Sequence, residues 1–187
     1  MGTILRPLLP RKFEYVLFKA DSLEPPEDAD FTVEQIGPGQ EPTPEQQAFF
    51  VRCVGSMGFW YQMRWVRRGE GWAWITRNDG QPSSTMFATP AERLRKIFPV
   101  ITEEKAMNIG PGYTVPEFRG RGLYTKMVQY AANVAKEQGW GPFYGLTSLS
   151  NAAAIRGQEK CGLKRVGVWA GTRVLFNLIV MTRRVSD

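Results

Sequence analysis

A glycine-rich basic turn, Arg119-Gly120-Arg121-Gly122, is the feature that most constrains what this chain can form. It follows a stretch with strand character that ends near Val115, and it begins a helix with apolar residues at i, i+4, i+7, i+8 and i+11. These residues are Leu123, Met127, Tyr130, Ala131 and Val134. Gly139 stands where the C-terminal cap of that helix is expected. Because helix N-termini carry unpaired N–H groups and partial positive charge, the sequence predicts an anion site on a packed helix.

A second segment, from Asn151 to Leu163, predicts a short helix. Asn151 is a favourable N-cap, since its side chain can accept a hydrogen bond from a backbone N–H of the first turn. Gly162 ends the segment, and an apolar stretch over Phe143 to Leu149 predicts a strand before it. The two segments therefore repeat a strand, turn and helix order.

Taken together, in this order and at this spacing, the two segments resemble the GNAT acyltransferase superfamily. Its members bind acyl-CoA on an Arg/Gln-x-x-Gly-x-Gly/Ala loop and carry an Asn-led helix. The resemblance runs from about Ala106 to the C-terminus. It implies an α/β (α+β) fold in one domain, with a central mixed, mostly antiparallel sheet whose parted strands are flanked by helices. Residues 106–187 would form the cofactor-binding half, and residues 1–105 a more variable acceptor-side half.

The resemblance also implies which residues hold acetyl-CoA or another short acyl-CoA. Pantetheine would bond to the backbone of Tyr113, Thr114 and Val115, in the cleft between the strand Ala106–Val115 and the strand Phe143–Leu149. The pyrophosphate would bind the amides from Arg119 through Tyr124, namely those of Arg119, Gly120, Arg121, Gly122, Leu123 and Tyr124. Asn151 either caps its helix alone or also contacts the cofactor.

Two residues depart from the family pattern. Tyr124 stands where the loop usually has Gly or Ala, so we expect its ring to narrow or reshape the pocket. Gln158 stands seven residues after Asn151, where many members have a tyrosine that protonates the CoA thiolate. Glutamine donates a hydrogen bond but supplies no proton, so another group serves or the thiolate leaves unassisted.

No residue stands out as the base that deprotonates an incoming amine. Glu104 and Tyr113 are the named candidates, with Glu103, Ser148 and Ser150 beside them. Each is more simply explained as a solvated or structural polar residue, and a water relay is an equal alternative. An aromatic cluster predicts either core packing or a pocket for a ring-shaped acceptor. It consists of Phe59, Trp60, Tyr61, Trp65, Trp72 and Trp74.

Histidine is absent from the sequence, which excludes Ser-His-Asp and Cys-His catalysis and histidine metal ligation. Cys53 and Cys161 lie far apart without neighbouring ligands, so no zinc site is expected. We therefore expect no metal, and the resemblance implies acetyl-CoA or another short acyl-CoA as the cosubstrate.

Charge is unevenly distributed along the chain. Residues 119–187 hold 11 Lys+Arg and 3 Asp+Glu, a balance of +8, whereas residues 1–118 have a balance of −2. A basic half suits nucleic acid or the phosphates of CoA, and without a nucleic-acid-binding motif we favour the small anion. No apolar run approaches the roughly 20 residues of a membrane span, and no signal-like region precedes Pro7, so a cytoplasmic protein is expected. The strands and aromatic residues leave a homodimer open.

Outside the two motifs, residue patterns predict several further elements. Strands are expected at 15–19 and 31–36, a helix capped by Thr43 through Val54, and a short helix over 58–68. Asn78-Asp79-Gly80 predicts a hairpin turn between strands at 72–76 and 83–88. Gly110-Pro111-Gly112 predicts a bulge, an edge or a parting of strands. A turn at Gly171 is expected between closing strands at 163–170 and 173–182.

The leading hypothesis is an N-acyltransferase that moves an acetyl or short acyl group from CoA to a primary amine of a small molecule by direct attack. The second is a CoA-binding or interaction module without catalysis, suggested by Tyr124 and Gln158. The third is a nucleic-acid-binding protein that uses the basic half.

Overall fold

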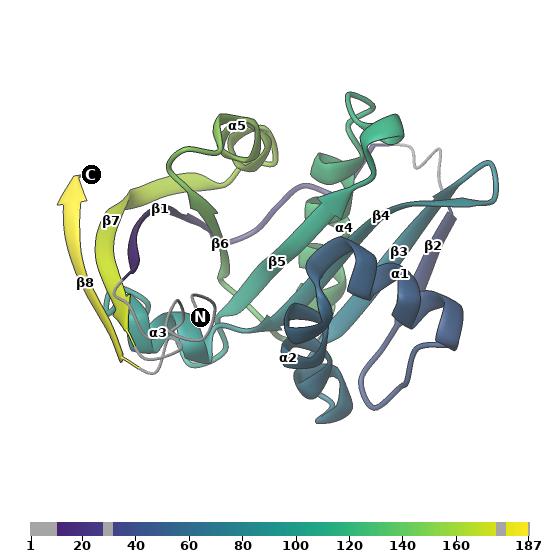
Figure 1. Cartoon of the computed structure of the whole chain (residues 1–187), viewed down its shortest axis with the longest axis horizontal. Helices are drawn as coiled ribbons and strands as arrows, with labels where there is room; N and C mark the ends of the chain where they lie inside the picture. The colour runs from purple at the N-terminus through teal and green to yellow at the C-terminus, as the bar shows by residue number, and fades with distance from the viewer. Residues whose placement is uncertain (1–10, 28–31, 175–178, 187) are drawn as a thin grey trace, which may run out of the picture.

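An eight-stranded sheet forms the centre of the molecule in the computed structural model, which describes residues 11–27, 32–174 and 179–186 (Figure 1). The strand order is β2-β3-β4-β5-β6-β1-β7-β8. Only β5 and β6 pair in parallel, and all the other neighbours are antiparallel. The strands are β1 (Arg11–Ala20), β2 (Thr32–Ile36), β3 (Trp72–Asn78), β4 (Gln81–Pro90), β5 (Met107–Thr114), β6 (Phe143–Ser148), β7 (Lys164–Val174) and β8 (Ile179–Ser186). The expected mixed, mostly antiparallel α+β sheet in one domain is confirmed.

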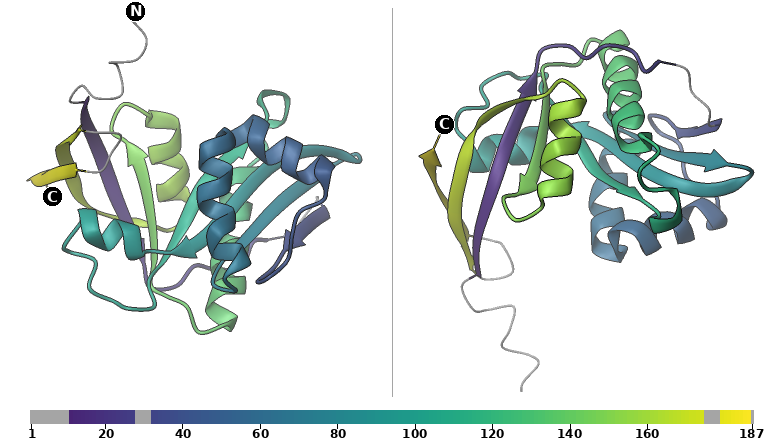
Figure 2. Two further views of the ribbon diagram at one scale, coloured as in Figure 1. Left: turned by 60° about the horizontal axis from the view of Figure 1, so that its bottom comes forward. Right: turned by 90° about the horizontal axis from the view of Figure 1, so that it is seen from above.

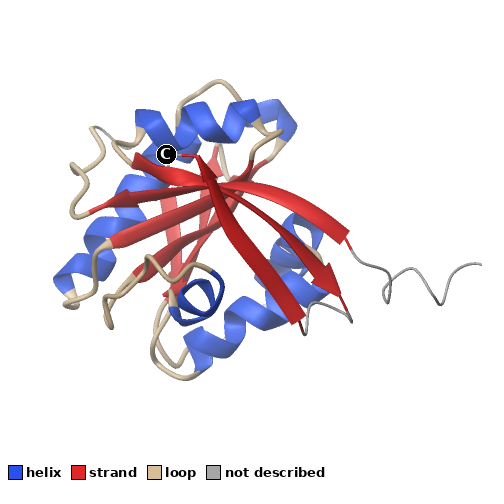
Figure 3. Cartoon of the chain, turned by 90° about the vertical axis from the view of Figure 1, so that its left-hand side faces the viewer, coloured by secondary structure: helices blue, strands red, loops and turns tan. Residues whose placement is uncertain are grey.

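Helices cover both faces of the sheet, as Figure 3 shows with strands in red and helices in blue. One core packs α4 and α5 against β3 to β6 and contains Trp74, Met127 and Phe143. On the opposite face, a second core joins α1 and α2 to β2, β3 and β4, and a third gathers around α3. The helices are α1 (Pro44–Val54), α2 (Ser56–Arg67), α3 (Glu92–Ile97), α4 (Leu123–Glu137) and α5 (Ala152–Lys160), and a 3-10 turn spans Pro116–Phe118. Among the described residues, no helix combines the length and apolar character needed to cross a bilayer.

Local sequence signals in the part of the chain before residue 106 are confirmed. Thr43 caps α1 in a capping box, in which its hydroxyl accepts from the Gln46 amide and the Gln46 side chain accepts from the Thr43 amide. The Asp79-Gly80 turn joins β3 to β4 as predicted. The second helix begins at Ser56 rather than Gly58, and the predicted strand at 31–36 is described from Thr32 onward.

The closing hairpin differs from the prediction. β7 runs through Gly171 without turning, because that residue pairs with Phe13 of β1 and with Thr182 of β8. The predicted turn at Gly171 is therefore wrong. The predicted strand 173–182 divides between the end of β7 and the start of β8, and residues 175–178 lie outside the described part of the chain.

The first strand takes a position that local pattern does not indicate. β1 lies between β6 and β7, pairing with both, so that Tyr15 faces Ser148 on one side and Trp169 on the other (Figure 2). Its residues Val16, Leu17 and Phe18 are fully buried. The N-terminal strand therefore pairs with strands from the C-terminal part of the chain and not with β2, the next strand in the sequence.

Parting of β5 from β6 is the feature that prepares a site. The two strands pair only at Met107 with Phe143 and at Asn108 with Tyr144, and then diverge. Beyond the pairing, β5 carries a bulge in which Gly110 and Pro111 oppose the single residue Phe87 of β4. The prediction that this proline accompanies a bulge and a parting of strands is confirmed.

Candidate cofactor-binding site

The backbone of the turn before α4 is exposed to solvent. Gly120 and Gly122 have φ of 80° and 74°, in the left-handed region that favours glycine, and no atom lies within 4 Å of the position of a Cβ on either. Gly122 is the N-cap of α4 and offers no side chain to its amides. A ligand can therefore approach this backbone closely.

Backbone donors at the start of α4 have no partner among the described residues. The first hydrogen bond into the helix runs from the Lys126 amide to the Gly122 carbonyl at 3.1 Å. The amides of Leu123, Tyr124 and Thr125 precede it and point out of the helix end. Unpaired amides at a helix N-terminus, together with the helix dipole, suit an anion, which is the kind of ligand that the sequence predicts here.

Two exposed arginines add positive charge to this turn. Arg119 donates from Nε to the Thr114 carbonyl at 3.1 Å, and its guanidinium lies 5.7 Å from the centre of the Tyr113 ring. Arg121 lies 5.3 Å from the centre of the Phe118 ring. Both guanidinium groups keep N–H donors directed to solvent, where they can meet phosphate oxygens.

The edge of β5 beyond the parting faces no strand. From Ile109 to Thr114, the described strands pair with β5 only on its β4 side. An extended ligand can therefore add to this edge as a further strand would. Within the predicted trio, Val115 is the least available, because its amide donates to the Ser83 carbonyl and its carbonyl accepts from the Phe118 amide.

Residues of α4 and α5 line the space above the parted strands. Tyr124 is half-buried between them, and burial raises the pKa of its hydroxyl well above the usual range. Gln158 is 3% exposed and faces β6. Tyr124 lies beside Gly157, the residue before Gln158, so the two residues that depart from the pattern of the motif lie near each other.

Comparison with known proteins agrees with this geometry. The model of the acetyltransferase (GNAT) family matches residues 41–163, which is more than half of the chain. The chain belongs to the GNAT acetyltransferase family. A search of curated proteins finds no match.

Solved GNAT structures share the fold at low sequence identity. An acetyltransferase of this family from Novosphingobium aromaticivorans has a TM-score of 0.63 at 17% identity, over 89% of this chain and 66% of that chain. One from Colwellia psychrerythraea has 0.58 at 15%, over 84% and 54%. An aminoglycoside N-acetyltransferase solved with CoA has 0.55 at 13%, over 71% and 91%. The present chain thus spans 66% and 54% of the first two structures it matches.

Asn151 caps its helix in this GNAT chain, as predicted. Its Oδ1 accepts from the Ala154 amide at 3.1 Å, and the side chain is exposed. Cys161 ends the helix, and its thiol donates to the Gly157 carbonyl at 2.9 Å. Burial raises the pKa of this thiol to about 11, so it is protonated at neutral pH.

Candidate bases lie at separate places in the GNAT fold. Glu103 lies before β5, where its Oε1 is 2.7 Å from Lys19 Nζ and its Oε2 accepts from the Tyr144 hydroxyl at 2.9 Å. Burial and this contact raise the pKa of Tyr144 to about 12. Glu104 is exposed in a turn. Glu103 is thus engaged in an ion pair. No sequence signal indicated that Lys19 and Tyr144 contact Glu103, because these residues lie in distant segments of the chain.

Ser148 ends β6 and Ser150 follows it, and both line a cavity next to β1, β7 and β8. Their hydroxyls, on Ser148 and Ser150, are 2.9 Å apart. The cavity has a volume of about 1070 Å³. It is lined from β1, β7 and β8 by residues that include Lys12, Glu14, Thr172 and Arg183. Of the other candidates, Glu104 precedes β5, whereas Tyr113 lies at the far end of that strand.

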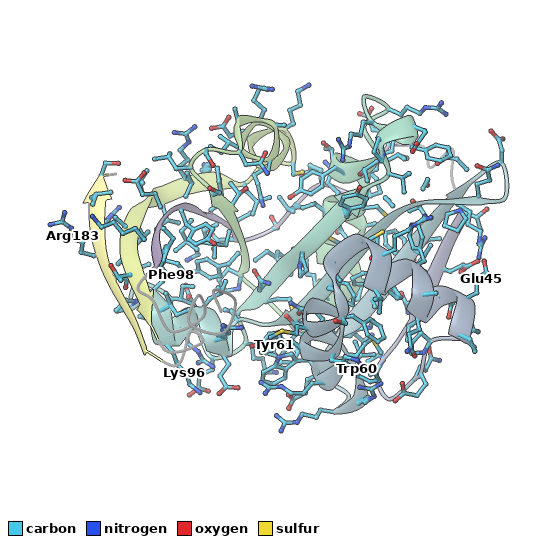
Figure 4. All side chains as sticks on the ribbon, in the orientation of Figure 1. Glu45, Trp60, Tyr61, Lys96, Phe98 and Arg183 are labelled. Carbon is cyan, nitrogen blue, oxygen red and sulfur yellow. The ribbon has the colours of Figure 1, made fainter. Side chains whose placement is uncertain are left out.

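Most of the predicted aromatic cluster is core. Phe59, Trp65, Trp72 and Trp74 are at most 4% exposed. Trp60 and Tyr61 lie instead on the outer side of α2, where Figure 4 labels them, and both stack with arginines. No group of three potential metal ligands occurs within the described ranges.

Proposed function

We propose that this GNAT-family chain transfers an acetyl or other short acyl group from acetyl-CoA to a primary amine of a small molecule. The observation that carries the proposal is the conjunction of two unpaired backbone surfaces. One is the start of α4, with the free amides of Leu123 to Thr125, and the other is the edge of β5 from Ile109 to Thr114. A phosphate group and an extended amide chain need these two surfaces, and CoA contains both.

Each predicted site residue has a role in this proposal. The amides from Gly120 to Tyr124 hold the pyrophosphate, with Arg119 and Arg121 as charged partners. The backbone of Tyr113 and Thr114 bonds pantetheine. Val115 contributes only its side chain, since its backbone N–H and C=O are already hydrogen-bonded within the protein. Asn151 lies at the start of α5. Its side-chain oxygen caps the helix, and its exposed side-chain NH2 group would make an additional contact with the cofactor.

Direct attack is the mechanism that suits these residues. The sequence lacks histidine, and both cysteines have thiols whose pKa is raised by burial, so an activated protein nucleophile is not supported. A backbone N–H at the β5 bulge would polarise the thioester carbonyl, the amine would attack its carbon, and the C–S bond would break. The thiolate would take up the proton lost by the amine, through solvent or a nearby group.

A second candidate is a CoA-binding module without turnover. Gln158 favours it, because the amide has no acidic proton for the departing thiolate. Calorimetric titration with acetyl-CoA, followed by an assay of free thiol release with a panel of primary amines, separates the candidates. Binding with amine-dependent release supports the enzyme, and tight binding without release with any amine supports the module. Absence of acetyl-CoA binding contradicts both.

A further inference from the structure

The groove between α4 and α5, above the parted strands, is filled by a tyrosine ring seated on two glycines. A Cβ on Gly112 of β5 would lie 3.2 Å from Tyr124 Cε2. A Cβ on Gly157 of α5 would lie 3.0 Å from both Tyr124 Cδ1 and Cε1. Opposite edges of the ring therefore touch the two walls of the groove, and each wall has a glycine at the contact.

Gln158 fills the rest of the groove in the same way. A Cβ on Gly145 of β6 would lie 2.6 Å from Gln158 Nε2 and 2.7 Å from its Cδ, so no larger residue than glycine fits there without moving the amide. Gly112 and Gly145 are the floor on β5 and β6, and Gly157 is the wall on α5. Three glycines thus make room for two side chains across the opening between the strands.

These two side chains differ in how readily they can move. Gln158 is 3% exposed and lies in the last turn of α5. Tyr124 is half-buried and is the second residue of α4, next to the open turn. Rotation about its χ1 can carry the ring toward solvent past the glycines of the turn, at the cost of its apolar contacts.

We propose that Tyr124 is the positioning residue that closes this groove, and that its ring must leave the space between Gly112 and Gly157 before a thioester cofactor can lie along β5. The inference rests on the proposed function, since it concerns the same cofactor. The ring lies beside Gly112, beyond the last residue of β5 that pairs with β6, so a ligand that runs along this part of β5 to the start of α4 meets the ring. The apparent affinity is then the intrinsic affinity multiplied by the fraction of molecules in which the ring has moved.

Binding kinetics of CoA to the full chain test this inference, with tryptophan fluorescence as the signal. In the wild type and in Tyr124→Phe, which keeps the ring, the observed rate should rise with CoA concentration at a similar low slope, because rotation is fast and only molecules with a displaced ring bind. In Tyr124→Ala, the slope should be higher and the Kd should fall about tenfold. Equal Kd values and equal slopes in all three proteins would overturn the inference.

A second variant keeps the test independent of the cavity that alanine leaves. Gly157→Ala retains Tyr124 but places a Cβ 3.0 Å from its ring, and alanine in the middle of α5 favours the helix. It should raise the slope of the observed rate against CoA concentration several-fold, and a slope equal to that of the wild type would count against the inference. If the wild type binds CoA while Tyr124→Ala gains nothing, only the role of Tyr124 fails. If none of the proteins binds CoA, the proposed function fails and the inference fails with it.

Discussion

Lys19 and Glu103 lie 84 residues apart in the sequence and form an ion pair with 2.7 Å between Nζ and Oε1. The pair joins the end of β1 to the loop before β5, and Tyr144 of β6 donates to the same carboxylate. Burial, which by itself raises the pKa of Glu103, is the largest single influence, but the hydrogen bonds from Lys19, Tyr144 and the backbone together with the Lys19 charge outweigh it, so the pKa is lowered. The contact therefore holds together the strands whose parting opens the groove.

Glu103→Gln should lower the free energy of unfolding by about 1 kcal/mol near pH 7, since both side chains are partly exposed. A lowered folded-state pKa contributes stability above the unfolded pKa of about 4.3, and this stability is lost as the pH falls through the folded value. The pKa of Lys19 is raised, mainly by its hydrogen bond to Glu103, so its contribution is lost only as the pH rises above 10.5. Urea unfolding of both proteins from pH 3 to 8 measures the difference, which should shrink below about pH 4.5.

Glu104→Gln is the matched control, because Glu104 is the next residue and is exposed. It should change the free energy of unfolding by less than about 0.5 kcal/mol at every pH. A similar loss in both variants, or a difference for Glu103→Gln that does not depend on pH, would show that the ion pair is not the cause.

Two glycines near α2 should respond in opposite directions to alanine. Gly71 precedes β3, and a Cβ there would lie 3.1 Å from the Ala88 carbonyl oxygen and 3.2 Å from the Val66 nitrogen. Backbone atoms give way poorly, so Gly71→Ala should destabilise the protein by about 1–3 kcal/mol. In Gly58→Ala, the Cβ would meet only Val54 at 3.6 Å inside a helix, and we expect stabilisation of about 0.5–1 kcal/mol. Thermal unfolding compares the two, and a loss in both would contradict the contacts described.

Asn151 should stabilise α5 through its cap. Asn151→Ala removes the acceptor for the Ala154 amide and should cost about 1 kcal/mol, whereas Asn151→Ser keeps a cap and should cost little. Serine cannot reproduce the amide donors, so acetyl-CoA affinity of Asn151→Ser, measured by calorimetry, separates capping from cofactor contact. Affinity equal to that of the wild type would restrict Asn151 to capping.

Local signals in the sequence were sufficient for elements that short-range chemistry determines. The capping box of Thr43, the Asp79-Gly80 turn and the Asn151 cap were predicted because their partners lie within a few residues. The glycine-rich turn before α4 could likewise be located from the sequence, because the turn and the amphipathic helix that it begins are neighbours in the chain.

Long-range pairing could not be predicted in this way. Gly171 suggested a turn because glycine is common in turns. In the structure, β1 and β8 pair with β7 on its two sides at this residue, so β7 continues through Gly171. Helix α3 was not predicted, since its N-cap is Ala91, which makes no side-chain capping bond. The sequence identified Tyr124 and Gln158 as departures from a motif. Their contacts with Gly112, Gly157 and Gly145 could not be predicted, because these glycines belong to β5, α5 and β6, which are brought together only by the fold.

The most direct test of the cofactor site is calorimetric titration of acetyl-CoA into the wild type, Thr125→Gln and Thr125→Glu. Thr125 is the third residue of α4, among the unpaired amides, so a carboxylate there favours the helix while it repels phosphate. The account predicts that Thr125→Gln binds within about threefold of the wild type, and that Thr125→Glu binds at least about tenfold more weakly with an equal or higher Tm. Equal affinity in the two folded variants, or no binding to the wild type, would contradict it.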